Sequence, residues 1–128
     1  MEVTDYTPAD LLETARELLS RTDTKAKGIW PRAAALLCRQ ALETSLERFW
    51  KTRLPGMESV TMRAQLTCLV TYMDDAELAG RAAYTWTALS QACHHHTYEI
   101  APTDAELRTW MQVVACLEGA LKPLRSDH

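Results

Sequence analysis

The chain has 128 residues, of which 47% are hydrophobic, and a formal net charge of −3. This length suits one domain with its own core, so residues 1–128 are taken as a single domain. The negative charge argues against a protein that binds nucleic acid non-specifically by neutralising phosphates. The N-terminus has no export signal and no stretch approaches the roughly 18 apolar residues of a membrane span, so we expect a cytoplasmic location and no membrane contact.

Leucine and alanine are abundant and phenylalanine occurs once, which favours helices over strands. A first helix is expected over residues 8–21, because Thr7 can cap it and an apolar face repeats along it. A second, longer helix is expected over residues 30–54, where Pro55 and Gly56 end it. Both helices carry apolar residues at steps of three and four positions, as helices packed on a core do.

Three further helices follow. Residues 60–73 predict the third, and Asp74 or Asp75 is expected to cap the fourth, whose apolar face continues to the histidines near residue 96. The fifth helix opens with a Thr-x-x-Glu capping box and spans about residues 103–121. The connections are short, which favours helices that run antiparallel to their neighbours. The predicted fold is therefore all-α, a single antiparallel bundle of about five helices.

Two sets of polar residues have simple interpretations. Arg39 and Glu43 are four positions apart on the second helix, a spacing that suits an ion pair. The four cysteines are spread over four helices with no Cys-x-x-Cys pair and no zinc-finger spacing, so we interpret them as reduced thiols: Cys38, Cys68, Cys93 and Cys116. Neither a metal site nor a cofactor is predicted.

The run His94-His95-His96 is the one feature that composition does not explain. Adjacent helical residues point about 100° apart, so three consecutive histidines do not ligate one ion, and Glu99 is the only acidic residue at a suitable spacing. In a structural interpretation, His96 continues the apolar face of the helix and the other two histidines are partly solvated. Taken alone, the cluster favours this structural interpretation.

The segment Gln91–Tyr98 also resembles the signature of HEPN domains, which are small helical bundles of prokaryotic toxin–antitoxin and antiviral systems. His96-Thr97-Tyr98 is similar to the His-x-Tyr end of that motif, and residues 39–43 look like the helix that precedes it. The resemblance covers roughly residues 30–121. It implies a homodimer in which histidine and arginine line one cleft and cleave RNA without metal by activating the ribose 2′-hydroxyl.

The chain departs from the HEPN motif at the arginine. That position is held by Gln91 when it is paired with His96, and by Ser90 when it is paired with His95. Glutamine donates a hydrogen bond but does not balance a developing negative charge. Loss of such a donor costs roughly 3–4 kcal/mol of transition-state stabilisation.

Two other arginines of the sequence are candidates for the missing cation. Arg81 lies on the same helix but about 22 Å from His96, which is too far, whereas Arg39 could approach from the second helix. The candidate catalytic residues are His96, His95, Gln91 and Tyr98.

Three functions follow from these observations. The favoured one is a HEPN-like module that has lost nuclease activity and acts through dimerisation and a protein partner or RNA. The alternatives are an active metal-independent ribonuclease that uses His95 or His96, and a helical scaffold unrelated to RNA. The first is favoured because the histidine and tyrosine positions fit the motif while the charged position does not.

Overall fold

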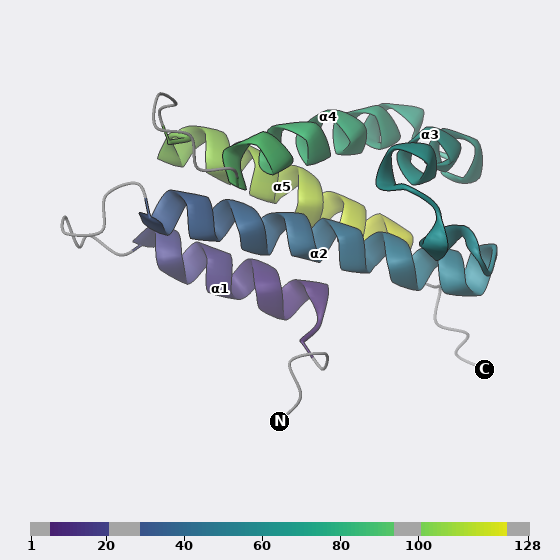
Figure 1. Ribbon diagram of the computed structural model, residues 1–128, viewed down its shortest axis with the longest axis horizontal. Coiled ribbons are helices and arrows are strands. Elements are labelled where there is room, and N and C mark those ends of the chain that lie inside the picture. The colour runs from purple at the N-terminus through teal and green to yellow at the C-terminus, as the bar shows by residue number, and fades with distance from the viewer. Residues whose placement is uncertain (1–5, 21–28, 94–100, 123–128) are drawn as a thin grey trace.

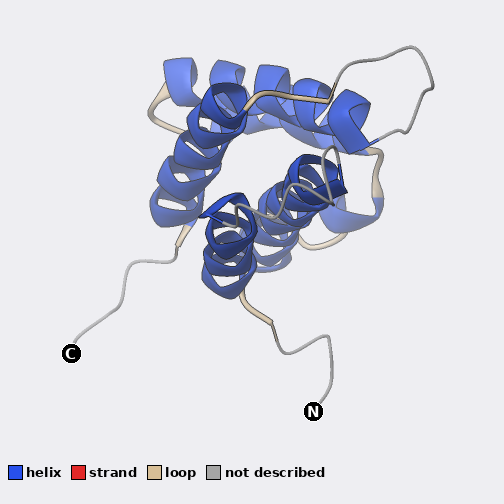
Figure 2. Ribbon diagram, turned by 90° about the vertical axis from the view of Figure 1, so that its left-hand side faces the viewer, coloured by secondary structure: helices blue, strands red, loops and turns tan. Residues whose placement is uncertain are grey.

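A computed structural model describes residues 6–20, 29–93 and 101–122. This part of the chain is helical and contains no strand, which confirms the predicted all-α class (Figures 1 and 2). It holds five α-helices and one short 3-10 helix: α1 (Pro8–Ser20), α2 (Ile29–Arg53), η3 (Met57–Ser59), α3 (Met62–Tyr72), α4 (Ala76–Cys93) and α5 (Asp104–Leu121).

Short polar side chains fix where α1 and α4 begin. Thr7 Oγ1 accepts a hydrogen bond from the Asp10 backbone N–H at 3.1 Å, and Asp10 Oδ2 accepts one from the Thr7 N–H at 3.1 Å. At the start of α4, Asp75 Oδ1 accepts from the Leu78 N–H at 3.0 Å. These bonds satisfy N–H groups that have no partner within the helix. The predicted cap of the first helix is confirmed, and Asp75 is the residue that caps the fourth.

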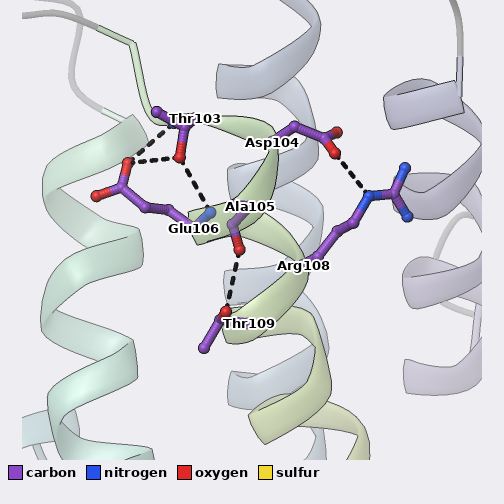
Figure 3. A network of polar contacts seen from close by, with 6 residues as sticks. All are labelled: Thr103, Asp104, Ala105, Glu106, Arg108 and Thr109. Atoms are coloured by element: carbon purple, nitrogen blue, oxygen red, sulfur yellow. Dashed lines mark hydrogen bonds and ion pairs between the residues drawn. The ribbon is translucent and has the colours of Figure 1, made fainter.

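The capping box of α5 is also confirmed. Thr103 Oγ1 accepts from the Glu106 N–H at 3.1 Å, while Glu106 Oε1 accepts from the Thr103 N–H at 2.9 Å (Figure 3). The third helix begins two residues later than predicted. Thr61 caps it by accepting from the Ala64 N–H at 3.2 Å, and η3 occupies part of the preceding connection.

The helix α2 lies at the centre of the molecule and packs against α1, α4 and α5 (Figure 1). Its inward face is fully buried and consists of Ala34, Ala35, Cys38, Ala41, Leu42, Leu46 and Trp50. Small residues on this face let the neighbouring helices approach closely, and Trp50 fills the space at the far end.

The helix α3 packs mainly against α4 and therefore lies at the edge of the molecule. The apolar repeat of residues 60–73 places Met62, Leu66, Leu69 and Met73 on one face, but only Leu66 and Leu69 are buried, while Met62 and Met73 are half-buried. Within the described ranges, no helix combines the length and apolar character needed to cross a membrane.

Candidate functional site

Of the four predicted catalytic residues, the structure describes Gln91 alone. Gln91 is exposed in the last turn of α4. His95, His96 and Tyr98 lie outside the described residues, as does His94. The candidate site is therefore described through the residues of α2 and α4 that lie near Gln91.

Arg32, near the start of α2, reaches the end of α4. Its Nη1 donates a hydrogen bond to the backbone carbonyl oxygen of Ala92 at 3.2 Å, and the contact is partly buried. The last carbonyls of a helix lack partners within the helix, and the negative end of the helix dipole favours a cation there. Arg32 therefore fixes the end of α4 against α2, two residues before the first histidine of the run.

Arg39, Glu43 and Trp86 form a second link between α2 and α4. It lies two to three turns from Arg32 along α2 and somewhat less than two turns from Ala92 along α4. Trp86 Nε1 donates to Glu43 Oε2 at 2.9 Å. Arg39 Nε lies 3.6 Å from the same carboxylate oxygen, so the predicted ion pair is confirmed. That separation is too long for a hydrogen bond, and the buried Nε has no hydrogen-bond acceptor among the described residues.

We call this set the α2–α4 seam: Arg32, Arg39, Glu43, Trp86 and the carbonyl of Ala92. The sequence predicted the Arg39–Glu43 pair but neither the contact of Arg32 nor the role of Trp86. One signal could have indicated Arg32, since it precedes Arg39 by seven residues and two helical turns return a residue to nearly the same face. No comparable signal in the sequence joins Trp86 to Glu43, because 43 residues separate them.

The charges of the seam extend to Cys93, the last residue of α4. Burial raises the pKa of Cys93 above its ordinary value, with Arg39 opposing the shift and Glu43 adding to it. Burial likewise raises the pKa of Cys38 to about 12, with Arg16 opposing the shift and Cys93 adding to it. Both thiols are therefore protonated at neutral pH and are poor nucleophiles.

Arg81 and a possible metal site are the two other features of the described residues that concern catalysis. Arg81 forms an ion pair with Glu77 at 3.1 Å on the first half of α4, where both side chains are largely exposed, so it takes no part in the seam. Among the residues that the structure describes, no three His, Cys, Asp or Glu side chains gather closely enough to hold a metal ion. Arg32 links α2 to α4, whereas Arg39 pairs with Glu43 on α2 itself, so both arginines of the seam already engage groups of the protein.

No protein-family model, no curated protein and no solved structure matches this chain. The seam and the resemblance of residues 91–98 to the HEPN motif are thus the observations that bear on function.

Proposed function

We propose that this chain is a HEPN-like helical module that has lost nuclease activity. It acts in the cytoplasm through dimerisation and through binding of a protein partner or RNA, in a prokaryotic defence or toxin–antitoxin setting. Its five helices form the antiparallel bundle of that class. Support for this arrangement comes from the two links of the seam, because Arg32 and Glu43 follow each other along α2 while their partners Ala92 and Trp86 come in the reverse order along α4.

The observation that carries the proposal is the environment of the arginine position. Gln91 stands there, exposed and uncharged. The nearest arginines identified on α2 engage protein acceptors, Arg32 at the Ala92 carbonyl and Arg39 at the Glu43 carboxylate. A guanidinium already paired with a carboxylate gives a developing phosphorane less stabilisation than an uncompensated one. Cleavage should therefore lack the electrostatic contribution that a dedicated arginine supplies.

One observation favours the alternative of an active ribonuclease. The Nε–H of Arg39 has no hydrogen-bond acceptor within the described ranges, so its guanidinium is only partly satisfied by Glu43. In that alternative, Arg39 stabilises the phosphorane and His95 or His96 acts as the base. The helical scaffold unrelated to RNA stays the third possibility, and it requires that the histidines have no role in cleavage or binding.

Restoring the arginine provides the test. Gln91→Arg places a cation at the motif position without disturbing a buried contact, because Gln91 is exposed. We expect the purified Gln91→Arg variant to cleave RNA in EDTA and the wild-type protein not to do so. Cleavage should disappear again when His95→Ala and His96→Ala are added.

A matched control adds the same charge elsewhere. Gln40→Arg is also an exposed glutamine-to-arginine change, on α2, and we expect no cleavage from it. Cleavage by the wild-type protein that depends on the histidines would favour the active ribonuclease instead. An inactive Gln91→Arg variant would show that the missing arginine is not what prevents cleavage.

A further inference from the structure

An open groove runs between α3 and α4, on the side of α4 next to its solvent-exposed face. Its volume is about 350 Å³, and Val70, Gly80, Ala83 and Trp86 supply much of its lining. A Cβ atom at Gly80 would meet no atom within 4 Å, so the space above this residue is empty. The small residues of α4 would let a bulky side chain from another molecule approach the helix backbone.

The face of α4 beside this groove has the composition of an interface. No Asp, Glu, Lys or Arg occurs over residues 82–93. Tyr84 nevertheless has 73% of its surface exposed, and Val70 at the groove is 46% exposed. An exposed helix face in a monomer usually carries charges, whereas the centre of a protein–protein interface is depleted of them and enriched in tyrosine, tryptophan and arginine.

Charge complementarity identifies what covers this face. Arg63 lines the groove, and none of the ion pairs among the described residues includes it. Glu77 lies at the other end of the same face and pairs only with Arg81, at 3.1 Å, where both side chains are largely exposed. An exposed ion pair between residues four positions apart on one helix contributes little to stability. Glu77 can therefore leave Arg81 for another partner at small cost. Arg63 and Glu77 are thus available to pair with each other between two copies of this chain.

We propose that a second copy of this chain docks on the α3–α4 groove, with the two α4 helices antiparallel about a twofold axis near residue 82. In this register Tyr84 of each copy enters the empty space above Gly80 of the other, beside Val70. Only residues 73–75 connect α3 to α4, so these helices run in opposite directions and Arg63 lies level with Trp86. The same register brings Glu77 of the second copy to the level of Arg63 and Trp86, where it can pair with Arg63. Because the axis is twofold, this ion pair and the contact of Tyr84 with Gly80 each form twice.

The interface rests on the self-association proposed above and gives it a specific geometry. The two Gln91 residues would lie about 27 Å apart along the helix direction, at a rise of about 1.5 Å per residue. Each copy would therefore carry its own HEPN-like segment at a separate end of the dimer. The two copies would therefore not share one cleft, and cleavage by Gln91→Arg would have to use the arginine and the histidines of the same copy.

The test compares two glycines that both lie in helices with open space around them. Gly80→Gln fills the groove, whereas Gly119→Gln makes the same change on α5, away from the groove. Both changes should preserve or raise helix stability, because glycine is a poor helix residue. In analytical ultracentrifugation we expect a wild-type dimer, a dissociation constant raised at least about tenfold by Gly80→Gln, and no change from Gly119→Gln.

A charge exchange tests the register. Arg63→Glu should weaken the dimer, and adding Glu77→Arg to the same chain should restore much of the affinity, with circular dichroism confirming that each variant is folded. A dimer that Gly80→Gln and Arg63→Glu both leave intact would overturn this interface but not the self-association. A wild-type chain that stays monomeric would overturn both, leaving the groove to a partner protein, while the cleavage experiment on Gln91→Arg would still test the rest of the proposed function.

Discussion

The hydrogen bond between Trp86 and Glu43 joins α2 to α4 close to the HEPN-like segment, and its contribution can be measured by a double-mutant cycle. Trp86→Phe removes the Nε1–H that donates to Glu43 Oε2 at 2.9 Å. Glu43→Met removes the acceptor while keeping a side chain that suits a helix. The two single variants and the double variant together isolate the interaction between the two side chains from the lost packing of each.

The expected magnitude follows from burial. A hydrogen bond to a charged group contributes roughly 1.5–3 kcal/mol to the free energy of unfolding. The Glu43 side chain is 36% exposed, so water compensates part of this loss. We therefore expect an interaction energy of about 1 kcal/mol, measured by urea unfolding followed by helical circular dichroism.

A surface ion pair serves as the control. Arg108 Nε lies only 2.7 Å from Asp104 Oδ2, but these side chains are 53% and 58% exposed (Figure 3). The same cycle on this pair should give no more than about 0.5 kcal/mol, although its distance is shorter. An interaction energy at Arg108–Asp104 equal to or larger than that at Trp86–Glu43 would refute the reasoning that burial, rather than distance, decides the contribution.

Three further predictions concern the helix starts and the thiols. Thr103→Ala should lower the free energy of unfolding by about 1 kcal/mol because it removes the cap of α5, whereas Thr109→Ala, whose hydroxyl only bonds back to the Ala105 carbonyl, should change it by no more than a few tenths in the same urea titration. A thiol reagent should modify the exposed Cys116 rapidly and the buried Cys38 only after unfolding; equal rates would contradict the burial of Cys38. Burial raises the pKa of Cys38 to about 12, so the thiol ionises at a lower pH in the unfolded chain than in the folded one. The free energy of unfolding should keep its full value below about pH 9 and fall as pH rises towards about 12, and this alkaline loss should be smaller in Cys38→Ala.

Features that depend on neighbouring residues in the sequence were predicted well. The caps at Thr7 and Thr103 join residues three positions apart, so their geometry is set by the local chain. The Arg39–Glu43 pair is equally local. Burial of the helix faces also followed from periodicity, because a 3.6-residue repeat determines which side chains can face the core.

The start of α3 was placed too early because it depends on contacts over a longer span. Gly56 has a φ of 105°, a backbone conformation that favours glycine, and its N–H donates to Glu58 Oε1 at 2.9 Å. Gln65 Nε2 then donates to the Val60 carbonyl at 2.8 Å and holds that residue outside the helix. The side chain that fixes the connection thus comes from the helix that follows it.

The α2–α4 seam was only half predictable for a similar reason. The contact of Arg32 with Ala92 joins residues 60 positions apart, and it exists only because α2 and α4 pack together. Periodicity indicates which face of a helix is polar but not which acceptor that face will meet. The sequence therefore predicted the pairing of Arg39 with Glu43, whereas the acceptor of Arg32 became evident only from the packing of α2 against α4.

The most direct test of the proposed loss of nuclease activity is RNA cleavage by the purified wild-type protein in EDTA, beside a variant carrying His95→Ala and His96→Ala. We predict no cleavage by either protein, because Gln91 replaces the arginine of the motif and Arg39 is paired with Glu43. Cleavage by the wild-type protein that is absent from the variant would contradict this account and establish a metal-independent ribonuclease.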